Sequence, residues 1–283
     1  MKQIRKLASF LRWRLVPIRY LTMLRHMRWR RLIIRSPSVS SISFEIEEFG
    51  YHVTTPVDKD VIEKIRAIYS PRTASVIPNE YGHPFANLFN EDDIHPENPV
   101  LQTVFSPKIL NAAADYFGNK LILDSIQVLY SYSTAGEIRE SQYWHLDYGD
   151  RKSFHAITYL NDIRSGEDGP FVFVDKRATQ KIGRSLIIRR IADEHFTKKL
   201  GDESVINFLG AAGSTVFVDP AACYHYGSRC KFSRLALFTT FSGWFPYAQP
   251  MPIISDNKKK FYKVAKYLRP DLNSNFLKII LQI

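Results

Sequence analysis

Two side chains that commonly bind metal ions stand two residues apart in the segment WHLD, residues 144–147. In an extended strand, residues i and i+2 project from the same face, about 6–7 Å apart at the backbone, so His145 and Asp147 could both reach one ion. A third ligand could come from His225, which follows the apolar segment 214–219. Two histidines and one carboxylate on one face form the facial triad of non-haem Fe(II) oxygenases, which leaves adjacent positions open for a bidentate co-substrate and dioxygen. The three residues therefore predict a redox iron site rather than a closed structural metal site.

A lone His-x-Asp pair is weak evidence, because many proteins carry one by chance as a hydrogen-bonded surface pair. Arg234 strengthens the prediction, since it follows His225 by nine residues and begins the apolar segment 234–242. A guanidinium inside a barrel needs an anionic partner because it cannot lose its charge. The dicarboxylate 2-oxoglutarate could be that partner, with one end on iron and the distal carboxylate on Arg234. The less favoured alternative is a structural Asp at the strand edge.

The chain has only two cysteines, Cys223 and Cys230, which lie on either side of His225. Two cysteines are too few for a disulfide framework, and this favours a reducing compartment. A zinc site at these residues would lack a fourth ligand and the usual paired spacing, so zinc is an improbable interpretation.

The elements that must position these residues change type along the chain. The 283 residues, 45% of them hydrophobic, are enough for one domain without structural metal, and no apolar run approaches the roughly 18 residues of a membrane span. Helical spacing of apolar residues predicts helices over 58–69, 106–118 and 189–200. Short β-branched and aromatic runs predict strands over 121–133, 154–162, 170–175, 214–219 and 234–242. We therefore expect a mainly β protein with flanking helices and a many-stranded antiparallel sheet, followed by a basic amphipathic tail.

Three segments in residues 130–242 resemble the phytanoyl-CoA dioxygenase-like Fe(II)/2-oxoglutarate-dependent oxygenases: WHLD, NDIRSGEDGPFVFV and GSTVFVDPAACYHYGSRCKFSRLALFTTF. The resemblance implies a double-stranded β-helix, that is, an eight-stranded jelly roll of the cupin kind. It also implies that His145, Asp147 and His225 bind Fe(II), that Arg234 binds the co-substrate 2-oxoglutarate, and that dioxygen is consumed. Two departures from the family pattern stand out. VDKRATQ stands where the family commonly has a Pro-Gly-Ser-His turn, so the rim that contacts substrate is different. Gly227 stands where a serine is common, which leaves the co-substrate contacts other than Arg234 open.

Further contacts to the co-substrate are predicted at four residues that precede or line the same sheet: Tyr130, Tyr132, Gln142 and Thr158. Tyr and Thr are common on any β surface, so a packing role is at least as probable for each of them.

Residues 1–36 are predicted to be a basic arm attached to an oxygenase domain of residues 37–283. Residues 1–35 hold eleven Lys and Arg and no acid, interleaved with Leu, Ile and Trp. Such a segment suits a membrane interface over anionic lipid, where each basic residue adds roughly 1 kcal/mol. Arginines interrupt every apolar stretch, which excludes a secretory signal. Packing of the arm on the domain, a transit peptide and a nucleic-acid-binding arm are the alternatives. The favoured location is the cytoplasm, peripheral on the cytoplasmic face of the inner membrane.

Ten basic residues cluster in the segments next to the predicted iron site: Arg139, Arg151, Lys152, Arg164, Lys176, Arg177, Lys181, Arg184, Arg189 and Arg190. They suggest an anionic substrate at a membrane surface, unless they form only a solvated basic face. In size, basic arm and triad placement the chain is similar to bacterial Kdo 3-hydroxylases. That resemblance implies hydroxylation of an anionic membrane glycolipid at the Kdo sugar of lipopolysaccharide. The alternatives are a hydroxylase of an acyl-CoA or small metabolite, a nucleic-acid demethylase, which is less favoured, and a non-catalytic jelly-roll module that binds membranes.

Overall fold

The computed structural model describes residues 40–79, 81–133, 138–184, 189–201, 203–244, 246 and 248–283. The predicted basic arm lies outside these residues, so its membrane attachment and the domain boundary near residue 37 stay predictions. Within the described residues, no helix combines the length and the apolar character that crossing a membrane would need.

Two antiparallel sheets form the centre of the fold. The larger sheet has the order β1-β7-β4-β9-β3-β2, with β1 at Tyr51–Thr54, β2 at Phe85–Asn87, β3 at Leu121–Ser131, β4 at Ser153–Tyr159, β7 at Thr215–Val218 and β9 at Arg234–Gly243. The smaller sheet has the order β6-β5-β8, with β5 at Phe171–Phe173, β6 at Ile206–Phe208 and β8 at His225–Tyr226.

Isolated bridges extend the smaller sheet beyond β8. His145 pairs with His225, and the neighbouring Trp144 pairs in turn with Ile191. Apolar side chains from both sheets, such as Phe173 of β5 and Ile157 of β4, pack into one buried cluster between them. Two antiparallel sheets packed face to face form a β-sandwich, the architecture to which a jelly roll belongs, and the predicted class of a mainly β protein with flanking helices is confirmed.

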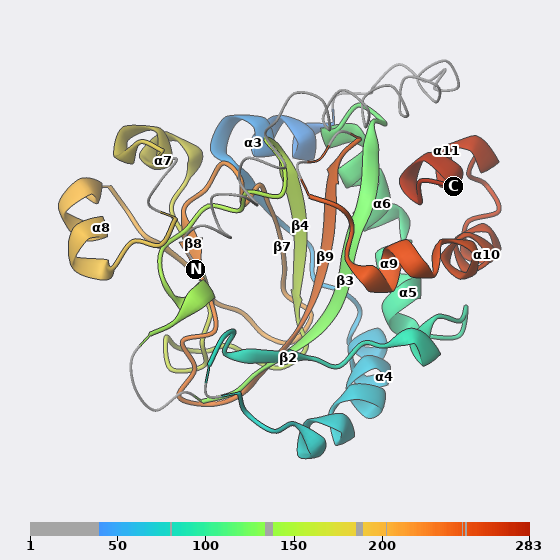
Figure 1. Cartoon of the computed structure of the whole chain (residues 1–283), viewed down its shortest axis with the longest axis horizontal. Helices are drawn as coiled ribbons and strands as arrows, with labels where there is room; N and C mark the ends of the chain where they lie inside the picture. Colours follow the sequence, from blue (N-terminus) through green and yellow to red (C-terminus); the bar gives the residue numbers. More distant parts are fainter. Residues whose placement is uncertain are drawn as a thin grey trace, which may run out of the picture.

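Helices cover the other face of the larger sheet (Figure 1). They are α3 at Ser41–Phe49, α4 at Lys59–Tyr69, α5 at Pro99–Val104, α6 at Pro107–Tyr116, α9 at Pro252–Asp256, α10 at Lys258–Leu268 and α11 at Ser274–Ile280. The short helices α7 at Lys176–Ile182 and α8 at Asp193–Leu200 lie on the opposite side of the molecule (Figure 1). Short 3-10 turns span Pro71–Ser75 (η1), Glu91–Asp93 (η2) and Glu140–Gln142 (η3).

Side chains alternate between the two faces along the central strands, as extended backbone requires. In β4, Phe154 and Ala156 belong to the cluster beneath the helices, whereas Ile157 and Tyr159 belong to the cluster between the sheets. The side-chain face therefore decides which residues can reach a site between the sheets.

The predicted helices 58–69 and 106–118 and all five predicted strands are present, each with boundaries shifted by a few residues. The helix predicted from 189 begins only at Asp193, because Ile191 is hydrogen-bonded to Trp144 as part of a sheet. The segment VDKRATQ, predicted as a different rim, mostly forms α7, where the Asp175 side chain accepts a hydrogen bond from Ala178 N. The basic tail forms α10 and buries Phe261 against the core.

Candidate metal centre

Three predicted ligands come together between the sheets. His145 and His225 face each other across a backbone pair in which each N–H donates to the other's carbonyl at 3.0 Å. The Asp147 N–H donates to the Pro220 carbonyl at 2.9 Å, which fixes the carboxylate beside the two rings. Asp147 Oδ1 lies 3.7 Å from His145 Nε2 and 3.8 Å from His225 Nε2. One ligand atom from each residue lies within 4.8 Å of the others, which is close enough for a single ion.

Backbone carbonyls set the tautomer of both histidines. His145 Nδ1 donates to the Tyr143 carbonyl at 2.7 Å, and His225 Nδ1 donates to the Cys223 carbonyl at 2.9 Å. In each case the proton is held on Nδ1, so the lone pair of Nε2 points toward Asp147. This is the usual arrangement of metal-binding histidines, in which the second ring nitrogen is fixed by a hydrogen bond.

The electrostatics of the site also suit a cation. Burial, together with the neighbouring His225, lowers the pKa of His145 to about 3, and burial lowers the pKa of His225 as well. Burial would raise the pKa of Asp147, but the electrostatic influence of His225, His155 and His145 outweighs it, and the pKa is lowered. At neutral pH the site therefore holds two neutral imidazoles and one carboxylate, which is the protonation state that a metal ion requires.

A turn held by Asp219 supports the backbone of Asp147. Asp219 Oδ1 accepts hydrogen bonds from Ala221 N at 2.9 Å and from Ser153 N at 3.1 Å, while the Tyr116 hydroxyl donates to Oδ2 at 2.8 Å. The Pro220 carbonyl, which holds Asp147, lies within this turn. The larger sheet and α6 thus position the Asp147 backbone through one buried carboxyl group.

Two polar side chains that were not predicted from the sequence lie beside the triad. His155 Nε2 lies 3.5 Å from Asp147 Oδ2, and the same strand face carries Ile157. A histidine within the apolar run of a predicted strand was the available signal. Asp124 is the extra residue at the irregularity between Leu123 and Ser125 of β3, and burial, together with Asp147 and Asp150, raises its pKa to about 7. Bulges often redirect a side chain next to a functional site.

Arg234 is buried between the sheets, with 2% of its surface exposed. Its guanidinium donates to the Gly169 carbonyl and to the hydroxyls of Ser131 and Ser228, both at 3.2 Å. Nε has no hydrogen-bond partner, and no carboxylate within the described part of the chain forms an ion pair with it. The alternative of a structural Asp partner therefore finds no support. A buried cation with only neutral acceptors lacks a charge partner, which an anionic ligand could supply.

Ser228, the residue after Gly227, supplies a serine hydroxyl beside Arg234. Its φ is 61°, a left-handed conformation that is uncommon for serine, and its hydroxyl contacts both Arg234 and Ser131, the latter at 2.8 Å. Gln142 stabilises this turn, since its Nε2 donates to the Ser228 carbonyl at 2.8 Å. Gln142 therefore acts on Arg234 through Ser228.

Tyr130 lies on the helix-covered face of β3, and Tyr132 follows the last residue of that strand. Tyr130 packs against the cluster beneath the helices, and the two tyrosine rings are neighbours at 6.4 Å. The Tyr132 hydroxyl accepts from Asn79 N at 2.9 Å and donates to the His83 carbonyl at 3.2 Å. Ser131, between the two tyrosines, is the residue that faces Arg234.

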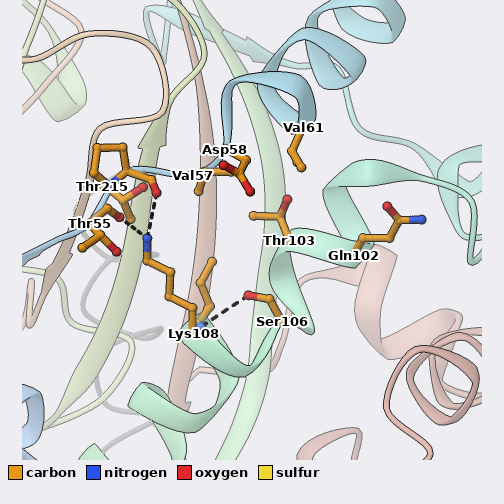
Figure 2. A pocket seen from close by; sticks show the side chains of 11 residues that line it. Thr55, Val57, Asp58, Val61, Gln102, Thr103, Ser106, Lys108 and Thr215 are labelled. Carbon is orange, nitrogen blue, oxygen red and sulfur yellow. Dashed lines mark hydrogen bonds between the residues drawn. The ribbon is translucent and has the colours of Figure 1, made fainter.

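Thr158 also lies on the helix-covered face, opposite to His155, and its hydroxyl is 2.9 Å from that of Thr215. The structure therefore does not bring Thr158 to the triad. Thr215 lines a cavity of about 350 Å³ on that side of the sheet, where Lys108 donates to the carbonyls of Thr55 and Pro56 (Figure 2). None of the predicted ligands lines this cavity.

Six of the ten predicted basic residues form ion pairs with acids. The pairs are Lys152 and Lys176, which share Glu47, Arg164 with Asp162, Arg177 with Glu48, Lys181 with Glu203, and Arg190 with Glu140. Much of the positive charge of this predicted cationic surface is therefore offset by acids of the same surface. Arg190 differs, because its guanidinium is close enough to affect all three triad residues.

Comparison with known proteins supports the fold. The sequence matches no family model, and no curated protein matches it. Among solved structures, the chain is similar to the epimerase SnoN in complex with Fe3+, alpha ketoglutarate and nogalamycin RO, with a TM-score of 0.53 and 14% identity over 71% of this chain and 82% of that one. It is similar to EctD from S. alaskensis with 2-oxoglutarate and 5-hydroxyectoine, with a TM-score of 0.52 and 14% identity over 75% and 78%. It is also similar to the carbocyclase SnoK, with a TM-score of 0.52 and 16% identity over 73% of this chain and 85% of that one. The chain therefore has the jelly-roll fold found in these non-haem iron proteins.

Proposed function

We propose that this chain is an Fe(II)/2-oxoglutarate-dependent dioxygenase. The observation that carries the proposal is the combination of the His145, Asp147 and His225 cluster with a buried Arg234 that has no anionic partner within the described residues. The neutral imidazoles and the carboxylate fit Fe(II), and the unpaired Nε fits a carboxylate of the co-substrate. The solved structures of similar fold include complexes with iron and with 2-oxoglutarate.

The triad, Arg234 and His155 have different roles in this proposal. Bound Fe(II) supplies the oxidation in which dioxygen converts 2-oxoglutarate to succinate and carbon dioxide and adds its second oxygen atom to a substrate C–H bond. His145, Asp147 and His225 hold the metal on one face. Arg234, with Ser131 and Ser228, binds the distal carboxylate and fixes the direction of the co-substrate. His155 holds Asp147 in place, and the surrounding apolar cluster excludes water.

For the substrate, we propose an anionic membrane-associated glycolipid, the Kdo sugar of lipopolysaccharide. The support is the basic composition of residues 1–35 and the cationic segment around Arg190. A second candidate is a small metabolite or acyl-CoA, and the ion pairs that five of the basic residues form with four acids favour it. Membrane attachment through the arm on the cytoplasmic face remains part of the first proposal only.

The experiment is succinate formation from 2-oxoglutarate by the Fe(II)-loaded full-length protein in air, with and without Kdo-lipid A. Succinate that rises with the glycolipid and disappears in His225→Ala supports the enzyme and the substrate together. Succinate that forms equally without the glycolipid supports the enzyme and rejects Kdo. Absence of succinate together with absence of bound iron rejects the enzyme and favours a non-catalytic binding module.

A further inference from the structure

A short antiparallel pairing places Arg190 directly opposite His145. Trp144 N donates to the Ile191 carbonyl at 3.1 Å, and Ile191 N donates to the Trp144 carbonyl at 2.9 Å. In an antiparallel pair, each step forward on one strand matches a step backward on the other. The residue after Trp144 is His145 and the residue before Ile191 is Arg190, so these two stand across from each other.

The buried side of this pairing shows which way Arg190 faces. Trp144 and Ile191 both belong to a buried apolar cluster, where the Trp144 ring stacks on Phe196 at 3.9 Å. Side chains alternate along extended backbone, so His145 and Arg190 share the other face. That face carries the metal cluster, and Arg190 therefore stands at the edge of the site.

The charge of Arg190 affects the pKa values of the triad residues. After burial and the charges of the neighbouring triad residues, Arg190 is a further cause that lowers the pKa of His145, and it contributes in the same direction at Asp147. The cation is therefore close to the ligands, in agreement with the pairing.

Within the described residues, the one ion-pair partner of Arg190 is weakly bound. Arg190 Nη2 is 3.8 Å from Glu140 Oε2, beyond hydrogen-bond distance, and both side chains are at least a third exposed. Such pairs contribute about 0–1 kcal/mol. By contrast, Arg229 in the same region is held by Asp193 at two distances of 2.8 Å and by the Gln142 carbonyl. Among the cations that the structure describes near the triad, Arg190 thus keeps hydrogen-bond donors that a ligand could use.

We propose that Arg190 binds an acidic group of the substrate, a carboxylate or a phosphate, and so selects anionic substrates at the iron site. The inference rests on the proposed oxygenase function and names the residue that decides its substrate class. The carboxylates of 2-oxoglutarate are accounted for by the metal cluster and Arg234, which leaves Arg190 for the second ligand. A planar guanidinium suits both acidic groups, because it can donate two parallel hydrogen bonds.

The test measures binding to the full-length protein loaded with Fe(II) and 2-oxoglutarate under nitrogen, so that no turnover occurs. The probes are a Kdo methyl glycoside, the methyl ester of its carboxylate, and glucose 1-phosphate, each titrated by calorimetry. We expect the wild type to bind the acid about 10- to 30-fold more tightly than the ester, a preference that one charged pair can supply. Arg190→Gln should reduce this ratio to about 1 to 3, and Arg190→Lys should retain part of it.

Arg189→Gln is the matched control, since it removes the same charge from the neighbouring residue, whose guanidinium lies over the Tyr148 ring at 4.9 Å. It should keep the preference for the acid. Glu140→Gln should tighten binding of the acid a few-fold, because it removes the anion that competes for Arg190. A preference for glucose 1-phosphate, again lost in Arg190→Gln, would assign a phosphate instead of a carboxylate.

The inference is overturned if Arg190→Gln keeps the preference, or if the wild type prefers neither anion. It is also overturned if Arg190→Gln raises the KM for 2-oxoglutarate by the same factor as the Kd for the acid, since Arg190 would then contact the co-substrate. Succinate formation in air and iron content decide the oxygenase function separately. A protein that forms succinate but shows no anion preference would retain the proposed function and lose only this inference.

Discussion

Replacing Arg234 by methionine should separate the stability of the fold from binding of the co-substrate. The guanidinium is buried, has three neutral acceptors and leaves Nε unpaired. Replacing buried charges by apolar groups of similar volume is often neutral or stabilises a protein by about 1–4 kcal/mol. Ser131 and Ser228 keep their mutual hydrogen bond at 2.8 Å, so only the Gly169 carbonyl loses its donor, at about 1 kcal/mol. We therefore expect Arg234→Met without ligand to be about 0–3 kcal/mol more stable than the wild type.

Binding of 2-oxoglutarate should change in the opposite direction. Loss of one partner of a buried charge pair costs about 3–5 kcal/mol, which is roughly 100- to 4,000-fold in affinity. At about 100 times its Kd, 2-oxoglutarate stabilises the wild type by about 2.7 kcal/mol. For a domain of this size, that corresponds to a rise in Tm of roughly 5–10 °C. Arg234→Met should show almost no rise at the same concentration.

The assay is thermal unfolding of Fe(II)-loaded protein under nitrogen, with and without 2-oxoglutarate. Arg269→Met is the matched control, because Arg269 is also buried, at 7% exposure, but forms two hydrogen bonds with Asp271 at 2.9 and 2.8 Å. This variant should lose stability and keep the full response to 2-oxoglutarate. The reasoning is refuted if Arg234→Met keeps a wild-type rise in Tm, since the anion would then bind elsewhere.

Three further predictions concern the residues around the triad. His155→Ala should weaken iron binding by about 10- to 100-fold, because His155 holds the Asp147 carboxylate. Titration of the protein with Co(II) would measure the metal affinity, and an unchanged affinity would exclude the positioning role. In the metal-free protein, His145 and His155, with pKa values of about 3 and about 4, stay neutral in the fold while the unfolded chain takes up protons below about pH 6.5, so each should contribute a loss of stability approaching 1.4 kcal/mol per pH unit between about pH 6 and pH 4.5. Asp124 and Asp219, whose pKa values are raised to about 7 and about 6, take up protons in the fold and oppose this loss, so the measurement is the difference between the wild type and His155→Gln. In urea unfolding the wild type should lose about 1.4 kcal/mol more per pH unit than the variant, and equal slopes would contradict the prediction. Ser228→Gly should weaken 2-oxoglutarate binding with little loss of stability. Ser228→Ala should lose the same affinity and about 1 kcal/mol more stability, because residue 228 has a φ of 61°, which glycine adopts without strain. Equal unfolding curves for the two variants would argue against strain.

The side-chain face of β3 shows why residue types alone do not select the neighbours of Arg234. Tyr130 and Tyr132 were predicted to bind the co-substrate, but Ser131 is the residue that contacts Arg234, whereas Tyr130 packs against the helix-covered cluster and Tyr132 follows the end of the strand. A shift of one residue exchanges the two faces of a strand, and β3 contains such an irregularity between Leu123 and Ser125. The same parity places Thr158 away from the triad and His155 next to it.

The sequence by itself determined the chemistry available to this protein and most of the elements that carry it. The spacing of His145 and Asp147, the later His225 and the arginine that begins an apolar strand are local patterns, and local patterns survive without knowledge of the fold. Only the tertiary structure decided that His225 pairs with His145, that Arg234 has no anionic partner among the described residues and that Arg190 stands at the edge of the site. These depend on sheet register between segments up to about 100 residues apart in the chain, as for Ser131 and Arg234, and a single sequence does not encode register in any short window.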